Sequence, residues 1–387
     1  IGHVLRGEIA VGDDVQLTLD SQRRTGVAAN HTATHLLNLG LRQVLGDGID
    51  QKGSLVAQDR LRFDFSHTRS VTPEELGRVE AIVRDRIARD LHVHADTAPL
   101  FVAKQVEGLR AVFGEAYPDP VRIVSVGAPI ASLLDSPKAA QWRDYSMEFC
   151  GGTHVERTSQ VQHFALVTEE AVAKGVRRIV GITGVPALAA IQTADKLAER
   201  LAAAAKLPDS QLGGVVAELS AEIDQLTLPA ARKAELRAAL AILHERIKGA
   251  EKHASAARSN EAAAIARQIG LAAAASLDDF VINTIEVGDD RKALQAAVST
   301  VAQLCPKKAV MLISPDAVGN KIAMLAAVPE ALIKRGLKAG DWVKAAADAC
   351  GGKGGGKPDS AQGGGTDVTK LKDTLLAARH FVARVLA

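Results

Sequence analysis

The sequence predicts an α+β protein with three consecutive parts, over residues 1–185, 186–275 and 276–387. In the first part, short stretches of alternating apolar and polar residues, typical of strands, are interspersed with a few helical patterns. In the second part, alanine is abundant and leucines recur at heptad spacing, which favours helices. In the third part, strand and helix patterns alternate again, as they do in a small α/β domain.

The composition narrows the classes of protein to consider. The formal net charge of the 387 residues is only +2, so nucleic-acid binding would have to come from local basic patches. Aromatic residues make up 3%, which argues against base stacking as the main mode of recognition. Three cysteines are a poor disulfide framework, so we expect a reducing, cytoplasmic setting. We find neither a signal segment nor a membrane-spanning run, and the start at Ile1 suggests a piece of a longer protein or a processed product.

The first part should contain both strands and helices. A turn at Gly12 precedes a strand pattern over residues 13–19. Asn30 is positioned to cap a helix that begins near His31 and ends at the glycines 46–48. The other expected elements are strands at 61–65, 121–126, 164–167 and 178–182, and a helix from Thr72-Pro73 to about Asp90.

The second part should form a helical hairpin. Apolar residues recur every three or four positions on both sides of Pro229, and Pro208 also interrupts the pattern. We expect two helices packed against each other within one chain, with a dimer zipper as the alternative. The residues of the expected seam are Leu212, Val215 or Val216, Leu219, Ile223, Leu226, Leu236, Leu240, Leu243, Ile247, Ala250, Ala254 and Ala257.

The third part should be a small α/β domain with a glycine-rich loop. Strands are expected at 281–287, 309–313 and 321–328, helices at 290–304 and 341–349, and a final helix from near Asp367. The loop over residues 351–365 contains eight glycines and two lysines. Glycine lets backbone amides approach a phosphate, and the pattern is not a Walker loop. A flexible linker is the alternative, but closely flanking helices favour a nucleic-acid backbone as partner.

Two short motifs of the first part look like halves of one metal site. His31 and His35 are four residues apart and share one face of the expected helix. Cys150 and His154 flank a Gly-Gly turn at the same spacing. Each pair alone is a weak signal, but together they provide the four donors that fill a tetrahedral zinc shell. We therefore predict one Zn²⁺ ion, held by His31, His35, Cys150 and His154.

Four protein ligands would favour a closed, structural zinc site. The neighbouring residues Thr32, Thr34 and Thr153 are small and polar, however, which indicates a pocket. Whether such an ion acts in catalysis or only in structure stays open at this point.

Five motifs are spread over nearly the whole chain: H-T-A-T-H-L-L at 31–37, Q-K-G-S at 51–54, R-L-R-F-D-F-S-H at 60–67, C-G-G-T-H at 150–154 and the stretch 351–365. They resemble the motifs of the alanyl-tRNA synthetase family and occur in the same order. Four resemble its editing domain, and the glycine-rich stretch resembles the signature of its C-terminal domain, which DHH-type phosphodiesterases share. The aminoacylation domain, which would bind ATP in a full-length enzyme, and the start of the editing domain's small barrel have no counterpart, so we expect a fragment.

The resemblance implies an aminoacyl-tRNA deacylase that hydrolyses Ser-tRNA(Ala) and Gly-tRNA(Ala) and spares Ala-tRNA(Ala). The resemblance also implies that His31, His35, Cys150 and His154 are the zinc ligands, and it places Thr34 and Gln51 in the amino-acid pocket. It also implies tRNA(Ala) as partner of the C-terminal domain, and we look for a homodimer contact in the hairpin and that domain. Our candidate tRNA contacts are Arg60, Arg62, Gly352, Lys353, Gly355 and Lys357.

Several alternatives remain at this stage. Zinc could polarise the ester carbonyl, activate water, or hold the amino group or terminal ribose of the substrate. Cys150 as a covalent nucleophile is a rival, although metal ligation would occupy its sulfur. The chain could also be a free-standing editing homologue, or a non-catalytic tRNA-binding and dimerisation module with a structural zinc. A DHH-type phosphodiesterase would need an Asp-His-His motif, which the sequence lacks.

Overall fold

The computed structural model describes residues 2–112, 115–288, 290–317 and 319–387. They form two compact units, residues 1–247 and 248–387, and the boundary between the units falls within the long helix α7 (Ala230–Ala275). The predicted boundaries after residues 185 and 275 do not coincide with this boundary, and the three-domain division stays a prediction. No helix in the described ranges is both long and apolar enough to cross a bilayer.

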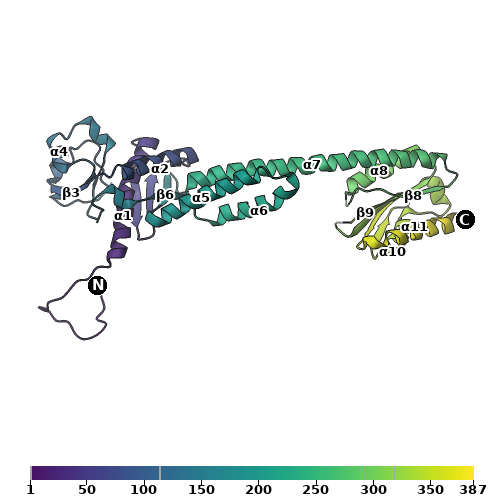
Figure 1. The fold of residues 1–387 in the computed structure, drawn as a ribbon, viewed down its shortest axis with the longest axis horizontal. Coiled ribbons are helices and arrows are strands. Elements are labelled where there is room, and N and C mark those ends of the chain that lie inside the picture. The colour runs from purple at the N-terminus through teal and green to yellow at the C-terminus, as the bar shows by residue number, and fades with distance from the viewer. Residues whose placement is uncertain (1, 113–114, 289, 318) are drawn as a thin grey trace. The chain divides into compact units, whose positions relative to one another are not determined.

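The first unit contains two separate antiparallel sheets with helices beside them, which confirms the α+β class (Figure 1). The four-stranded sheet has the order β1-β2-β7-β6, and the three-stranded sheet has the order β3-β4-β5. The elements before α7 are α1 (Ser21–Leu45), β1 (Gln51–Val56), β2 (Leu61–Ser66), α2 (Pro73–Ala88), β3 (Val93–Ala98), α3 (Leu100–Ala103), β4 (Val121–Val126), α4 (Ile130–Asp135), η1 (Ala140–Asp144), β5 (Ser146–Phe149), η2 (Thr158–Val161), β6 (Phe164–Ala173), β7 (Val176–Thr183), α5 (Gly184–Ala204) and α6 (Asp209–Gln225).

Helix α1 begins ten residues earlier than the sequence pattern predicted. Its N-cap is Asp20, whose carboxylate accepts from the backbone N–H of Arg23, and Gly46 ends it as expected. The predicted cap at Asn30 is wrong because Asn30 is buried inside the helix. Its amide donates to the carbonyls of Ala57 and Gln58, so this polar residue serves tertiary structure rather than helix initiation.

The predicted strand over residues 13–19 is also wrong. Residues 2–20 are exposed and form neither helix nor strand. A strand needs a neighbour for its backbone hydrogen bonds, and the described part of the chain supplies none here. In contrast, β1 was not predicted, and it exists because Gln51–Val56 pairs with β2 in an antiparallel ladder.

The core of the first unit lies between the four-stranded sheet and helices α1 and α2. The strands predicted at 61–65, 121–126, 164–167 and 178–182 are all present, and three of them extend further than expected. The helix predicted from Thr72 is present with a complete capping box, in which Thr72 and Glu75 satisfy each other's backbone N–H groups. The main core residues of the first unit are Leu36, Leu37, Leu61, Phe63, Phe65, Leu76, Val79, Val83, Phe164 and Ile179.

Three helices, rather than the predicted two, build the helical part of the first unit. Figure 1 shows α5 and α6 alongside the first part of α7, and all three contribute to one apolar cluster. The predicted hairpin misses α5, whose alanines supply the third apolar stripe. The predicted seam also ends earlier, because Ala254 and Ala257 are exposed. The cluster contains Ala194, Leu197, Leu201, Leu212, Val216, Leu219, Ile223, Leu236, Leu240 and Leu243.

The second unit is a five-stranded sheet with helices on both faces, as a small α/β domain requires. The strand order is β11-β12-β10-β9-β8, in which β8 and β9 run parallel and the other neighbouring strands run antiparallel. Helix α8 and the end of α7 pack on one face, and α10 and α11 pack on the other. The elements are β8 (Phe280–Thr284), α8 (Arg291–Leu304), β9 (Ala309–Asp316), β10 (Lys321–Ala327), α9 (Glu330–Lys334), α10 (Ala339–Ala349), β11 (Lys353–Gly356), β12 (Ser360–Gly365), η3 (Val368–Lys370) and α11 (Leu371–Leu386).

The predicted glycine-rich loop is a β-hairpin instead. Strands β11 and β12 pair in an antiparallel ladder, and β12 also pairs with β10. The glycines allow helix α10 to lie directly on this hairpin. A Cβ atom at Gly354 or Gly363 would come within 2.6 Å of Cγ1 of Val343. Close helix packing, rather than loop flexibility, therefore accounts for these two glycines.

Candidate metal centre and nucleic-acid interface

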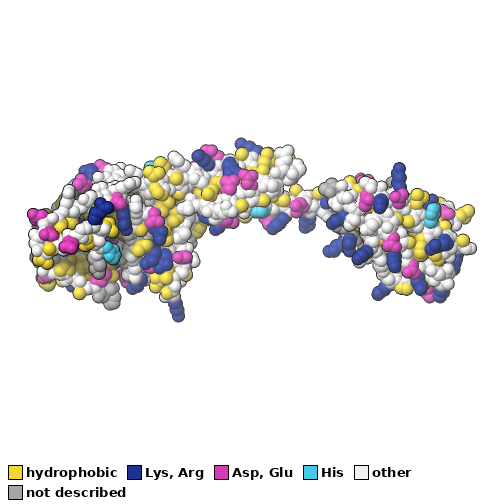
Figure 2. Space-filling view, turned by 90° about the horizontal axis from the view of Figure 1, so that it is seen from below, with side chains coloured by type: hydrophobic (Ala, Val, Ile, Leu, Met, Phe, Trp, Pro, Cys, Tyr) yellow, Lys and Arg dark blue, Asp and Glu magenta, His cyan; other side chains and the backbone are white. Residues whose placement is uncertain are grey.

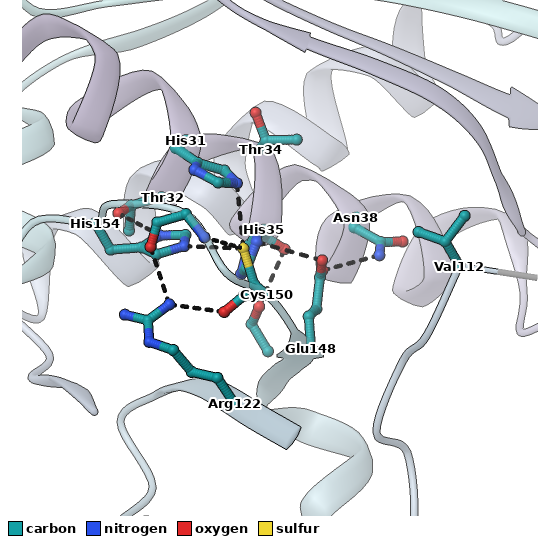
Figure 3. A network of polar contacts seen from close by, with 12 residues as sticks. His31, Thr32, Thr34, His35, Asn38, Val112, Arg122, Glu148, Cys150 and His154 are labelled. Atoms are coloured by element: carbon teal, nitrogen blue, oxygen red, sulfur yellow. Dashed lines mark hydrogen bonds and ion pairs between the residues drawn. The ribbon is translucent and has the colours of Figure 1, made fainter. Parts of the chain in front are cut away.

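The four predicted metal ligands meet in the first unit (Figure 3). One donor atom from each of His31, His35, Cys150 and His154 lies within 4.8 Å of all the others. The Cys150 Sγ atom is 3.4 Å from Nε2 of His31 and 3.4 Å from Nε2 of His154. Three imidazoles and one thiol at this separation form a donor set that suits a zinc ion.

Two elements and one turn bring the ligands together. His31 and His35 lie one helical turn apart on α1, and Cys150 directly follows β5. The turn after Cys150 needs a glycine, since a Cβ atom at Gly152 would lie 2.1 Å from Cε1 of His31. Arg122 on β4 holds this turn by donating to the carbonyls of Cys150 at 2.7 Å and Gly152 at 2.9 Å.

Burial sets the protonation states of the four candidate ligands in the absence of a metal. It lowers the pKa of His31 and of His35, and it lowers the pKa of His154 to about 3. All three imidazoles are therefore neutral at pH 7, which is the form that binds metal. Burial also raises the pKa of the Cys150 thiol. The Nδ1 atom of His35 is buried without a hydrogen-bond partner, as expected of a nitrogen that would bind an ion.

Two polar residues beside the cluster were missed by sequence reasoning. Oε2 of Glu148 is 3.4 Å from Nε2 of His35, and its Oε1 accepts from the Asn38 amide at 2.9 Å. Burial raises the pKa of Glu148 to about 7. The spacing held a signal: Glu148 is two residues before Cys150 in an extended segment, and Asn38 is three residues after His35 on one helix face.

The two predicted pocket residues occupy different surroundings. Gln51 lines a small cavity of about 40 Å³ together with Asn38, Arg110 and Glu148. Thr34 is buried and does not line this cavity. Its hydroxyl donates to the backbone carbonyl of Asn30 at 2.8 Å. The structure thus brings Gln51, but not the hydroxyl of Thr34, to a cavity that shares Glu148 with the metal cluster.

A basic groove of about 650 Å³ lies on the second unit, beside the glycine hairpin. Arg291, Lys321, Lys353 and Gln362 line it together with several glycines. Figure 2 shows Lys and Arg side chains gathered on part of this unit. Phosphate groups could approach the backbone here, because a glycine-rich strand presents few side chains.

The predicted glycine and lysine contacts differ in their roles. Lys353 and Gly355 line the groove, and a Cβ atom at Gly355 would meet nothing within 4 Å. Gly352 also lines it but is closely packed, since a Cβ atom there would be 1.8 Å from the Gly364 carbonyl oxygen. Lys357 is exposed in the turn between β11 and β12 and does not line the groove.

The predicted tRNA contacts of the first unit, Arg60 and Arg62, lie at and just after the β1–β2 turn. Arg60 pairs with Asp59 at 2.8 Å on the surface. Arg62 lies 3.6 Å from Asp64, which also receives two hydrogen bonds from Arg178. Both arginines therefore have an acidic neighbour within the first unit, and their contact with tRNA stays a prediction.

Three family models match the chain in sequence order. The Threonyl and Alanyl tRNA synthetase second additional domain matches residues 121–180, the Alanine–tRNA ligase domain matches 187–250, and the DHHA1 domain matches 278–384. The first of these contains Arg122, Glu148 and two of the four ligands.

Full-length relatives match almost the whole chain. A cytoplasmic alanine–tRNA ligase of Dictyostelium discoideum is 38% identical over 96% of this chain, and one of Drosophila melanogaster is 36% identical over 99%. An alanine–tRNA ligase of Anaeromyxobacter dehalogenans is 39% identical over 100% of this chain. The chain spans 40% of the length of the first two relatives and 38% of the third. By these matches, the chain belongs to the alanyl-tRNA synthetase family.

Proposed function

We propose that this chain is the editing part of an alanine–tRNA ligase, an aminoacyl-tRNA deacylase that hydrolyses Ser-tRNA(Ala) and Gly-tRNA(Ala). The observation that carries the proposal is the convergence of His31, His35, Cys150 and His154 beside Glu148, which also lines the cavity with Gln51. We take zinc as the ion because three neutral imidazoles and one thiolate are ligands that it favours.

Each residue has a defined part in this proposal. The four ligands would hold a zinc ion, which when bound supplies a Lewis acid that can position or polarise the aminoacyl ester. Arg122 fixes the turn that carries Cys150 and His154. Gln51 supplies polar atoms to a cavity of about 40 Å³, which suits a group as small as a hydroxymethyl.

A second site for serine is needed because an apolar synthetic pocket rejects an added hydroxyl only about 100-fold. A polar cavity can bind the hydroxyl of serine. With alanine, which lacks that hydroxyl, the polar groups of the cavity would stay unsatisfied. We propose that Thr34 shapes this pocket through its packing. Replacing Thr34 with a larger residue should change the ratio of Ser-tRNA(Ala) to Ala-tRNA(Ala) hydrolysis at unchanged zinc content. Loss of zinc would instead make Thr34 a support of the metal shell.

The partner in this proposal is tRNA(Ala), bound in part by the basic groove of the second unit. Lys353 and Gly355 line that groove and are the favoured contacts, followed by Gly352, while Lys357, Arg60 and Arg62 are secondary candidates. A cytoplasmic setting and a homodimer through the helices or the second unit belong to the same proposal.

The test compares the zinc-loaded chain with buffer on Ser-tRNA(Ala), Gly-tRNA(Ala) and Ala-tRNA(Ala). We expect release of serine and glycine well above buffer and little release of alanine. A closed shell of four protein ligands favours one second candidate, a tRNA-binding module with a structural zinc. That candidate predicts bound zinc and bound tRNA without any deacylation above buffer, and such a result would replace the deacylase proposal.

A further inference from the structure

We propose that Glu148 is a positioning residue that fixes His35 for metal binding and links the metal centre to the cavity lined by Gln51. This inference rests on the metal centre proposed above and adds a residue outside its ligand set. Glu148 is joined to His35 on one side and lines the cavity on the other.

One ring nitrogen of His35 contacts Glu148, and the other has no hydrogen-bond partner. Its Nε2 atom is 3.4 Å from Oε2 of Glu148. Its Nδ1 atom is buried and has no hydrogen-bond partner. A carboxylate on one imidazole nitrogen fixes the tautomer and the ring orientation, and it leaves the other nitrogen to the metal. We infer that Nδ1 is the ligand atom of His35.

The other imidazoles divide their nitrogens in the same way. Nδ1 of His154 lies 3.1 Å from Oγ1 of Thr32, and its Nε2 faces the Cys150 sulfur at 3.4 Å. His31 also turns Nε2 toward that sulfur at 3.4 Å and makes a hydrogen bond with the backbone of Thr153. In all three rings, therefore, one nitrogen is held by the protein and the other is available to an ion.

Glu148 is itself held rigidly. It belongs to β5, where it pairs with Val124 of β4, and its Oε1 accepts from the Asn38 amide at 2.9 Å. Asn38 lies on α1 three residues after His35, so the same helix carries the ligand and the residue that fixes its partner. Figure 3 shows this sequence of contacts from Asn38 through Glu148 to His35. A carboxylate without freedom to rotate can set the orientation of an imidazole.

The cavity gives Glu148 its second role. The residue lines the same space as Gln51 and Arg110, while its other carboxylate oxygen faces His35. A group that enters this cavity would touch the residue that orients a metal ligand. Substrate binding and metal geometry would then be coupled through one side chain.

The test measures zinc affinity by chelator competition and the visible absorption of the Co²⁺-loaded protein. The variants are Glu148→Gln and Asn38→Ala, with Glu80→Gln as the matched control. Glu80 is another buried carboxylate of the first unit, and it accepts from the backbone N–H of Leu166 at 2.7 Å. We expect Glu148→Gln to weaken zinc binding roughly 10- to 100-fold and to change the cobalt spectrum. Asn38→Ala should act in the same direction, and Glu80→Gln should leave both readouts unchanged.

The outcomes separate this inference from the proposed function. Wild-type protein that binds no zinc or cobalt would overturn the metal centre and this inference with it. Wild-type protein that binds metal, together with Glu148→Gln at unchanged affinity and spectrum, would overturn the role of Glu148 alone. Where Glu148→Gln fails to fold, as judged by circular dichroism, Asn38→Ala decides: unchanged affinity and spectrum overturn the inference, and weakened binding supports it.

Discussion

Four side chains from distant parts of the chain lose most of their contact with water at one point, and this burial determines their chemistry. Burial disfavours the charged form of an imidazole, so His31, His35 and His154 have lowered pKa values and remain neutral at pH 7. Neutral imidazoles can bind a cation at once, without first releasing a proton. At the residue scale, the site is therefore prepared for a metal.

Cys150→Ala should remove the metal. The substitution deletes the only sulfur among the four donors, so we expect zinc content to fall from about one ion per chain to near zero, as measured by mass spectrometry of the metal. Cys305→Ala is the matched control, because Cys305 is a buried free cysteine of the second unit. Full zinc content in Cys150→Ala would show that the sulfur is not a ligand.

Burial of His154 should cost the metal-free protein stability as the pH falls below 6.5. The pKa of His154 is lowered from 6.5 to about 3 in the folded chain, so below pH 6.5 the unfolded chain binds protons that the folded chain does not. The contribution of neutral His154 to the free energy of unfolding is fully present above pH 6.5 and is lost progressively toward pH 3. Urea unfolding of chelator-treated protein between pH 7 and pH 5 measures it, with His154→Gln expected to show a shallower decline. Glu148, whose pKa is raised to about 7, acts in the opposite direction in this window and does so in both proteins. A pH dependence that is the same in His154→Gln as in the wild type would therefore contradict the burial argument.

The ligands could be predicted from sequence, but the residues around them could not. Two pairs of donors at helix and turn spacing carry a local signal, which is why His31, His35, Cys150 and His154 were identified. Arg122 acts through contacts across strands, and an isolated arginine in a strand has no distinctive pattern. The spacing of Glu148 from Cys150 becomes a signal only once Cys150 is taken as a ligand. Thr34 was assigned to the pocket by resemblance, yet its hydroxyl bonds the helix backbone.

At the scale of elements, the glycine-rich segment shows how one composition can serve two structures. Loop and strand were both compatible with residues 351–365, and the contact with α10 selects the strand pair. A similar tertiary effect explains the missed start of α1, since Asn30 is used to bind the β1–β2 turn. The strand expected at 13–19 failed for the opposite reason, as nothing described in the chain pairs with it. Local sequence patterns predicted an element correctly only where its tertiary contacts favoured the same secondary structure.

Gly363→Ala should destabilise the second unit. The added Cβ would lie 2.6 Å from Cγ1 of Val343, which forces α10 away from the hairpin at a cost of about 1–3 kcal/mol. Gly355→Ala is the matched control, because a Cβ there meets nothing within 4 Å. Val343→Ala combined with Gly363→Ala should recover part of the loss. Thermal unfolding of the full chain measures all three, and equal melting temperatures for Gly363→Ala and Gly355→Ala would refute the packing role.

At the scale of the whole molecule, one chain carries a cluster of four potential metal ligands in its first unit and a basic groove in its second. The net charge of +2 gives no general attraction to nucleic acid, so the tRNA binding proposed above would depend on the groove. The division into two units could not be read from composition, because α7 has helix-forming residues throughout and the boundary lies inside it.

Lys353→Ala should weaken tRNA binding and reduce its salt dependence. Each lost phosphate contact lowers the slope of log affinity against log salt by about 0.7–0.9. Filter binding of tRNA(Ala) at several salt concentrations measures this slope. Lys334→Ala is the control, since Lys334 is an exposed lysine of the same unit that does not line the groove. Identical slopes for wild type and Lys353→Ala would remove Lys353 from the interface.

The central claim is that the four-ligand cluster is the centre of a deacylase. Its most direct test is a zinc titration of the metal-free chain, followed by the rate of serine release from Ser-tRNA(Ala). We predict that deacylation rises with added zinc and saturates at about one ion per chain, and that Cys150→Ala stays at the buffer rate throughout. Protein that binds one zinc ion per chain and still releases serine no faster than buffer would contradict the claim.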